Sequence, residues 1–270
     1  MIVSVIIPTY NRIKYLPLAL ESLALQNFAK DEFEVIVIDD GSREDCQSVI
    51  DSFKDKLDLQ LIKLNHGGVC KARNAGVKIA KSDILAFFDD DAVADPNWLQ
   101  AIVESMKSEN MLVGRVKPLN RPFWGYFAPH YDRGEAMKPA NSLLEGNCAI
   151  KRSVFDKVGL FDENIDYGHE GQEFLNRAQK FFVLTYCPTM VIYHDYAFGL
   201  ADYLGKQFKF GEKSAYLKIK NGENKIVGVK EKNEVLEKLP VMKKITIKLI
   251  ARLGYFFHVW GFLSGQKKYK

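Results

Sequence analysis

Residues Ile84–Asp91 read ILAFFDDD, an apolar run that ends abruptly in three consecutive carboxylates. A run of that length predicts a buried β-strand. In an open α/β sheet, ligands bind outside the carboxyl ends of the strands, so the three acids are expected at a ligand site. Adjacent anions repel one another and lose solvation unless they share a cation. If the strand geometry continues, Asp89 and Asp91 point to the same side, which suits chelation of one hard metal ion; a solvated acidic loop is the alternative.

Other short apolar runs predict further strands, and each is followed by a segment with apolar residues at helical spacing. The expected strands cover residues 2–7, 35–38, 59–62 and 84–88, and the expected helices begin at Leu16, run through Val49–Phe53 and cover Ala72–Ala80. Strands that alternate with helices predict right-handed crossovers and a mainly parallel sheet flanked by helices. We therefore expect an α/β fold in which residues 1–91 form a nucleotide-binding half.

Beyond residue 91 the pattern is less regular. The expected elements are a helix over Pro96–Met106 with Asp95 as its N-cap, a long loop over Pro118–Met137, a helix over Glu173–Phe181, and strands at Ala149–Ile150 and Met190–Ile192. Within the loop, Trp124 and Tyr126 either stack on a sugar ring or anchor the loop, and the sequence favours neither role.

Charge is distributed unevenly along the 270 residues. Residues 1–205 contain 22 Lys and Arg against 29 Asp and Glu, whereas residues 206–270 contain 16 against 5, so the two parts are expected to do different things. Four widely spaced cysteines without a CxxC pair argue against a zinc site or a disulfide framework and favour a reducing, cytoplasmic location. We find no signal peptide and no uncharged apolar stretch of about 20 residues, so a membrane-spanning helix is not expected.

Polar and aromatic side chains follow several of the predicted strands. Tyr10 and Arg12 follow the first strand, Asp39–Ser42 the second, and the turn His66–Gly68 leads to Arg73 at a predicted helix start. Glycines and a helix N-terminus with nearby cations favour an anion such as a diphosphate. Each of these residues also has an ordinary structural interpretation, as a turn, a surface aromatic or a local ion pair. Neither GxxxxGK[ST] nor GxGxxG is present, so a P-loop NTPase or a dinucleotide-binding dehydrogenase has little support.

Six sequence blocks stand out when they are taken in order. They are Val5–Arg12 (VIIPTYNR), Val37–Ser42 (VIDDGS), Ala72–Gly76 (ARNAG), Phe87–Asp91 (FFDDD), Gly146–Arg152 (GNCAIKR) and Val158–Glu163 (VGLFDE). Together they resemble the ordered motifs of family 2 glycosyltransferases over about residues 2–211. The resemblance implies the GT-A fold, a nucleotide-sugar donor, a divalent cation (Mn²⁺ or Mg²⁺) and inversion at the anomeric carbon.

The resemblance also implies roles at the donor nucleotide. Tyr10 would stack on the base, and Asp39 would accept a hydrogen bond from a pyrimidine N3–H, which favours UDP- or dTDP-sugars. Asp91 is expected as the direct metal ligand and Asp89 at the ribose or a metal-bound water, while His194 either completes the metal shell or is an ordinary hydrogen-bonded histidine. The set expected at the donor is Pro8, Thr9, Tyr10, Arg12, Asp39, Arg73, Asp89 and Asp90, and the set expected at the metal is Asp91, Asp89 and His194.

The reaction also needs a base for the acceptor hydroxyl. In the family, a Glu-Asp pair is followed by an Arg seven positions after the Glu; here Glu170 and Arg177 match this pattern, but Gly171 stands where Asp is usual. This departure leaves the identity of the base open. Glu170 is the first candidate, with Glu173 and His169 in reserve. An ordinary acidic helix start is the alternative interpretation of the two glutamates.

The tail combines basic and apolar residues. Lys244, Lys248 and Arg252 recur at a spacing of four residues, close to Leu249, Leu253, Phe256, Phe257 and Trp260. A helix over residues 241–263 would suit the interface of an anionic membrane. Packing on the catalytic domain or on a second subunit of a homo-oligomer is the alternative. Charge alone would permit nucleic-acid binding, but no recognition motif supports it.

These patterns predict two domains, a GT-A glycosyltransferase domain at residues 1–211, with an acceptor and catalytic half from residue 92, and a basic helical extension at residues 212–270. The expected function is transfer of a single sugar from a nucleotide-sugar to a hydroxyl of a glycan or lipid-linked acceptor in cell-surface polysaccharide synthesis. The expected location is cytoplasmic, peripheral to the inner face of the membrane if the tail binds lipid. A catalytically inactive nucleotide-sugar-binding homologue and a sugar-phosphate nucleotidyltransferase are the alternatives.

Overall fold

The computed structural model describes residues 1–165, 168–222 and 240–269, and the chain folds into two compact units. The first, termed the sheet unit, contains Met1–Lys117, Asp132–Asp166 and Glu170–His194. The second, termed the helical unit, contains Pro118–Tyr131, Tyr167–His169 and Asp195–Lys270. The boundary predicted at residue 211 falls within a helix of the second unit. The division into a catalytic domain and a basic extension stays a prediction.

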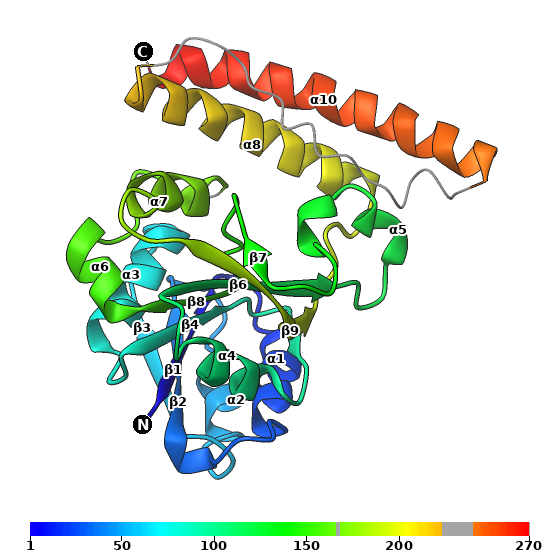
Figure 1. The fold of residues 1–270 in the computed structure, drawn as a ribbon. Coiled ribbons are helices and arrows are strands. Elements are labelled where there is room, and N and C mark those ends of the chain that lie inside the picture. Colours follow the sequence, from blue (N-terminus) through cyan, green and yellow to red (C-terminus); the bar gives the residue numbers. More distant parts are fainter. Residues whose placement is uncertain (166–167, 223–239, 270) are drawn as a thin grey trace. The chain divides into compact units, whose positions relative to one another are not determined.

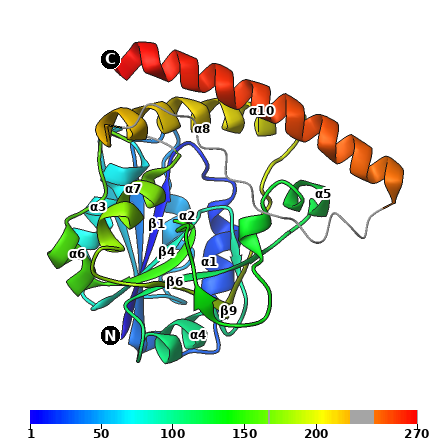
Figure 2. The same ribbon diagram turned by 45° about the horizontal axis from the view of Figure 1, so that its top comes forward.

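Within the described residues, the sheet unit is built on a mixed sheet of nine strands (Figures 1 and 2). The strands are β1 Val3–Thr9, β2 Phe33–Asp39, β3 Leu59–Lys63, β4 Ile84–Phe88, β5 Val93–Ala94, β6 Met111–Lys117, β7 Lys138–Pro139, β8 Asn147–Lys151 and β9 Leu184–Tyr193. Strands β3, β2, β1 and β4 are neighbours in this order and run parallel, as the alternation of strands and helices predicted. Strand β8 pairs antiparallel with β4 and β6, and β9 runs parallel to β6 and pairs with β5 and β7.

Helices cover both faces of this sheet. They are α1 Leu16–Ala24, α2 Gln47–Asp51, α3 Val69–Ile79, α4 Trp98–Ser105, α6 Arg152–Val158 and α7 Glu170–Ala178, with a 3₁₀ turn, η1, at Lys30–Glu32. Helices α3 and α6 lie on the opposite side of the sheet from α1 and α4 (Figure 2). Gly76 lets α3 pack closely on β1, because a Cβ at this position would lie 2.4 Å from Cγ2 of Ile6. The parallel pairing of β1 with β4 holds the carboxyl ends of these two strands side by side.

The predicted start of the helix after β5 is wrong. Helix α4 begins at Trp98 with Asn97 as its N-cap, two residues later than the predicted start at Pro96. The carboxylate of Asp95 accepts a hydrogen bond from the N–H of Asn97 at 3.1 Å, so it stabilises the turn before the helix instead of capping it. Helix α7 runs over Glu170–Ala178, close to the segment predicted from about Glu173, and both glutamates lie in its first turn, as the alternative of an acidic helix start expected.

Strand β6 was not predicted from the sequence. Its apolar start is followed by Gly114 and Arg115, a composition that does not favour a buried strand. The glycine is required, since a Cβ at position 114 would lie 2.3 Å from the carbonyl oxygen of Met190 and 2.4 Å from Nδ2 of Asn147. Asn147 donates to the carbonyls of Arg115 and Met190 and accepts from Nε1 of Trp98 at 2.8 Å. One buried amide therefore joins β6, β8, β9 and α4.

The helical unit contains α5 Pro122–Gly125, the 3₁₀ turn η2 Pro129–Tyr131, α8 Leu200–Lys220 and α10 Val241–Tyr269. The predicted C-terminal helical extension is thus present. Helices α8 and α10 lie side by side because glycines allow their backbones to approach (Figure 1). A Cβ on Gly211 would lie 1.9 Å from the carbonyl oxygen of His258, and one on Gly261 would lie 1.9 Å from that of Phe208. Across the described residues, no helix has the length and apolar character to cross a membrane.

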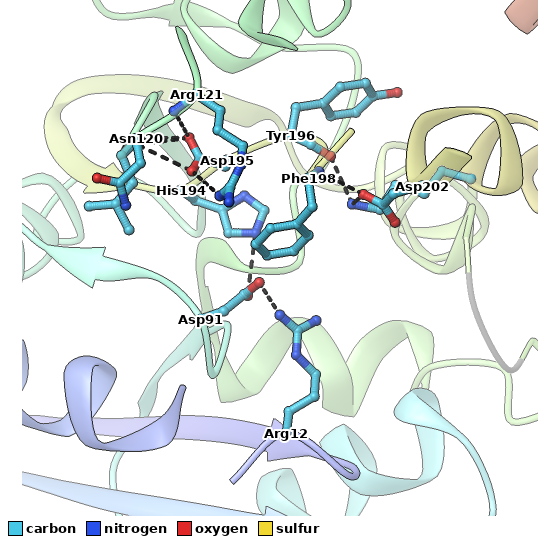
Figure 3. A network of polar contacts seen from close by, with 11 residues as sticks. Arg12, Asp91, Asn120, Arg121, His194, Asp195, Tyr196, Phe198 and Asp202 are labelled. Atoms are coloured by element: carbon cyan, nitrogen blue, oxygen red, sulfur yellow. Dashed lines mark hydrogen bonds and ion pairs between the residues drawn. The ribbon is translucent and has the colours of Figure 1, made fainter. Parts of the chain in front are cut away.

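Two short turns interrupt the loop that was predicted over Pro118–Met137. The ring of Trp124 stacks on Tyr203 with centroids 5.7 Å apart, so this residue anchors its segment, which is one of the two roles expected for it. The same segment is held by the carboxylate of Asp195, which accepts hydrogen bonds from the backbone N–H groups of Leu119, Asn120 and Arg121 (Figure 3).

Candidate active site

Strands β1 and β4 are parallel neighbours, so the residues that follow them meet at one edge of the sheet. Thr9, the last residue of β1, donates from Oγ1 to Oδ2 of Asp90 at 2.6 Å. Nε of Arg12 lies 3.3 Å from the other oxygen of this carboxylate. Burial raises the pKa of Asp90 to about 7 although Arg12 and Thr9 oppose the shift. Asp90 therefore ties the two strand ends together.

The carboxylate of Asp91 lies between Arg12 and His194, as Figure 3 shows. Nη2 of Arg12 donates to its Oδ2, and Nε2 of His194 lies 3.3 Å from its Oδ1. Burial alone would raise the pKa of Asp91, but the hydrogen bond and charge of His194, followed by Arg12, outweigh it and hold this pKa at about 2. The carboxylate is ionised at any working pH, as a metal ligand must be.

Asp89, Asp91 and His194 form a group that can hold a metal ion. One ligand atom from each lies within 4.8 Å of the others. Two carboxylates and an imidazole are a donor set that suits Mn²⁺, and the carboxylates also suit Mg²⁺. The side chain of Asp89 is 35% exposed, so a ligand can reach it. Gly146 leaves room for this carboxylate, because a Cβ there would lie 1.9 Å from Oδ2 of Asp89.

An aromatic pair lies beside the end of β2. The ring of Tyr10, which is 41% exposed, stacks on His66 with centroids 4.1 Å apart and an interplanar angle of 14°. Asp39 is buried opposite Thr9 in the β1–β2 register, and its Oδ1 accepts a hydrogen bond from the N–H of Ser42 at 2.9 Å. The sequence predicted a turn at His66–Gly68 but did not predict His66 itself at the donor site.

Asp40 organises the loop that carries His66. Its carboxylate lies 2.8 Å from Nδ1 of His66 and accepts hydrogen bonds from the N–H groups of Gly67 and Gly68 at 2.9 and 2.8 Å. Asp40 and Gly41, which has a positive φ of 82°, form the turn after β2, so both residues have a structural role. The loop in turn presents the start of α3, which contains Arg73.

Arg73 is buried, and its charge interacts with Asp89 of the candidate metal site and with two further carboxylates, Glu170 and Glu145. Its Nη2 lies 3.8 Å from Oδ1 of Asp89, and its Nη1 lies 3.1 Å from Oε1 of Glu170. Burial would lower the pKa of Arg73, but Glu170 and then Glu145 raise it, so the guanidinium stays charged. Glu145 accepts a hydrogen bond from the N–H of Gly171. Sequence reasoning missed Glu145, because only the folded chain brings it next to position 171.

The two reserve candidates for the base are held by partners of their own. Glu173 is buried and accepts hydrogen bonds from Nε and Nη2 of Arg177 at 3.0 and 2.8 Å. Arg177 also donates to the carbonyls of Val158 and Leu160, so the pair fastens α7 to the end of α6. His169 belongs to the helical unit, where its Nε2 lies 2.8 Å from Oγ of Ser214.

Comparisons with known proteins identify relatives of this chain. Residues 4–159 match the family model described as glycosyl transferase family 2. Glycosyltransferase AglE of Haloferax volcanii is 28% identical over 220 residues, which cover 78% of this chain and 72% of AglE. Poly(ribitol-phosphate) beta-N-acetylglucosaminyltransferase TarS of Staphylococcus aureus is 37% identical over 122 residues, which cover 43% of this chain but only 21% of TarS.

A solved structure has the same fold. The mannosyltransferase PcManGT of Pyrobaculum calidifontis, in complex with GDP-Man and Mn²⁺, aligns with a TM-score of 0.65 at 16% identity, covering 97% of this chain and 72% of that one. The likeness establishes the GT-A glycosyltransferase fold that the sequence predicted. The family match covers more than half of the chain, and the protein therefore belongs to glycosyl transferase family 2 and is a glycosyltransferase.

Proposed function

We propose that this protein is a metal-dependent, inverting glycosyltransferase that moves a single sugar from a UDP- or dTDP-sugar to a hydroxyl of a glycan or lipid-linked acceptor. The observation that carries the proposal is the group formed by Asp89, Asp91 and His194 at the end of β4. When bound there, Mn²⁺ or Mg²⁺ would neutralise charge on the departing nucleoside diphosphate. A carboxylate cluster at a strand end fits a nucleotide-sugar only with such a cation.

The remaining donor contacts come from residues around this group. Arg12 and Arg73 supply positive charge on either side of the three acids. Tyr10 offers an aromatic surface to the base, with Pro8 and Thr9 beside it in β1. Asp39, as the acceptor for a pyrimidine N3–H, favours uracil or thymine.

Relatives support a role at the cell surface. The name of TarS describes transfer of N-acetylglucosamine to poly(ribitol-phosphate), and a chondroitin synthase of Escherichia coli is 36% identical over 222 residues. This chain covers only 21% and 32% of these two proteins, respectively. We therefore propose a part in the synthesis of a cell-surface polysaccharide on the strength of the matched catalytic segment alone.

Release of UDP or dTDP, with water accepting the sugar in the absence of the acceptor glycan, tests the proposal directly. A panel of UDP- and dTDP-sugars is incubated with the protein in Mn²⁺, and the same panel is repeated in EDTA. We expect turnover of at least one donor in Mn²⁺, its loss in EDTA, and a reduction of about 100-fold or more for Asp91→Asn. Nucleotide binding without turnover of any donor would instead identify an inactive nucleotide-sugar-binding homologue.

We further propose that α10 docks on an anionic membrane surface, which would hold the enzyme at the inner face of the cell membrane. Exposed apolar side chains on α10, among them Leu249, Phe256 and Trp260, support this, as do the exposed cations Lys248 and Arg252. A second copy of the chain is the other candidate for this face.

A further inference from the structure

Position 171 lacks a side chain where the family resemblance leads one to expect an acid. In this chain the residue after Glu170 is Gly171. The carboxylate of Glu145 occupies the vacated space: a Cβ on Gly171 would lie 2.1 Å from Oε1 and 2.6 Å from Cδ of Glu145. A side chain at position 171 and the observed position of the Glu145 carboxylate therefore exclude each other.

The Glu145 carboxylate is held at this place by α7. Its Oε1 accepts a hydrogen bond from the N–H of Gly171, in the first turn of that helix. Partial positive charge at a helix N-terminus stabilises an anion in addition to the hydrogen bond. Glu145 lies two residues before β8, so the sheet brings a carboxylate from a distant segment to the point where the sequence omits one.

Glu145 and Glu170 differ in their surroundings. The side chain of Glu170 is only 7% exposed, its Oε1 lies 3.1 Å from Nη1 of Arg73, and its Oε2 is buried without a hydrogen-bond partner among the described residues. Glu145 keeps some solvent-exposed surface, whereas Glu170 keeps almost none. Desolvation and then repulsion from Glu170 raise the pKa of Glu145, with Arg73 acting in the opposite direction. A raised pKa brings a carboxylate closer to the working pH, where a base is most effective.

We propose that Glu145 is the general base of the transfer reaction, in place of the acid that position 171 lacks. This assignment rests on the proposed transferase function. The proton of the acceptor hydroxyl passes to the Glu145 carboxylate as the acceptor oxygen forms its bond to the anomeric carbon. The bond from that carbon to the diphosphate oxygen breaks, and its electron pair leaves with the nucleoside diphosphate. Arg73 balances the charge of Glu170 and Asp89 during the step.

A purely structural role for Glu145 is the competing explanation, because its carboxylate also holds the start of α7. Glu145→Gln separates the two roles, since a glutamine amide oxygen can accept the Gly171 N–H but cannot take a proton. Gly171→Asp becomes sterically admissible once the Glu145 carboxylate is removed. The double variant Glu145→Ala/Gly171→Asp therefore returns an acid to the usual family position.

The experiment compares four variants with wild type. They are Glu145→Gln, Glu145→Ala, Gly171→Asp and the double variant Glu145→Ala/Gly171→Asp. Glu104→Gln, at an exposed position on α4, is the matched control. Nucleotide release is measured with the donor that wild type turns over best in Mn²⁺, and calorimetry gives the Kd for UDP with Mn²⁺. We expect Glu145→Gln to bind UDP like wild type and to lose about 100-fold or more in turnover. The double variant should turn over at least about tenfold faster than Glu145→Ala, whereas Gly171→Asp alone should lose activity.

Rescue of turnover by added formate is a second test, because formate can replace a missing base but not a missing structural contact. A small carboxylate that accepts the proton should raise the turnover of Glu145→Ala but should not repair a displaced helix. Turnover of Glu145→Gln within about threefold of wild type, with UDP binding intact, would overturn the assignment. If wild type binds UDP but releases nucleotide from no donor, the proposed transferase function fails and the base assignment fails with it. If wild type turns over a donor, the transferase function stands, and the turnover of the Glu145 variants then tests the base assignment alone.

Discussion

Oδ1 of Asp91 lies 3.3 Å from Nε2 of His194, which directly follows β9. The N–H of His194 donates to the carbonyl of Lys117 at 2.8 Å, so the backbone fixes this histidine next to the acids that follow β4. If the imidazole is a metal ligand, His194→Ala removes one of three protein ligands. We expect the Kd for Mn²⁺, measured by calorimetry in the presence of UDP, to rise by about tenfold or more.

A matched control for this variant is His130→Ala, which removes a histidine from the 3₁₀ turn η2. We expect no change in its Mn²⁺ affinity. Unchanged Mn²⁺ affinity in His194→Ala would make His194 an ordinary hydrogen-bonded partner of Asp91, which is the alternative that the sequence left open.

The raised pKa of Glu145 makes a prediction about stability that does not depend on turnover. Its native pKa lies above the ordinary value of 4.5, so the native state binds this proton more tightly than the unfolded state does. The stabilisation is complete below about pH 4.5 and is lost as the pH rises through the native pKa. Burial and then the charge of Glu170 raise the pKa of Glu145, and Arg73 and the N–H of Gly171 act in the opposite direction.

The glutamine of Glu145→Gln does not titrate, so this variant should not lose free energy of unfolding in this way as the pH rises. Relative to wild type, its free energy of unfolding should therefore increase as the pH rises from 5 to 8. The expected gain is about 1.4 kcal/mol or more, the equivalent of a tenfold change in proton affinity. Urea unfolding of both proteins in metal-free buffer measures it, and a difference that does not vary with pH would contradict it.

The sequence correctly predicted those parts of the fold that depend on residues close together in the chain. Strand β4 and the acids after it form one continuous pattern, and the alternation of strands and helices up to residue 91 is regular enough to predict a parallel sheet. The later strands were harder to predict because β6 contains Gly114, whose role depends on the backbone of β9. Nothing local to Glu145 indicates that its carboxylate lies against Gly171, and the stack of His66 on Tyr10 depends on how two loops meet.

Gly114 is expected to be intolerant of a side chain. In Gly114→Ala the new Cβ would lie 2.3 Å from the carbonyl oxygen of Met190, so β6 and β9 would have to separate. We expect a loss of about 1–3 kcal/mol in the free energy of unfolding, measured in urea. Gly205→Ala is the matched control, because Gly205 lies within α8 and, among the described residues outside its own helical turns, no atom lies within 4 Å of an added Cβ. Its stability should be unchanged or up to about 1 kcal/mol higher, and equal losses in both variants would contradict the steric argument.

Helix α10 presents a mixed surface that its packing on α8 leaves uncovered. The residues of α10 that are buried are Ile247, Gly254, Gly261, Phe262 and Gly265. Leu249 and Phe256 are 59% and 62% exposed, and the cations Lys248 and Arg252 are exposed near them. Because Gly211 and Gly261 bring α8 and α10 into close contact, deleting α10 would also uncover α8. Substitutions at exposed positions therefore test the membrane proposal more cleanly than a truncation.

In Leu249→Glu/Phe256→Glu, two apolar side chains that would enter the lipid interface become anionic. We expect binding to vesicles of phosphatidylglycerol and phosphatidylcholine to fall by about tenfold or more, since each buried apolar side chain contributes roughly 1.5–3 kcal/mol. The control, Leu18→Glu/Leu25→Glu, alters leucines of the sheet unit that are 50% and 63% exposed, and it should bind vesicles like wild type. Cosedimentation measures the binding, and light scattering measures the mass of each protein. Wild-type binding in the α10 variant would contradict the membrane proposal, and a wild-type dimer that this variant converts to a monomer would assign the face to a second copy of the chain.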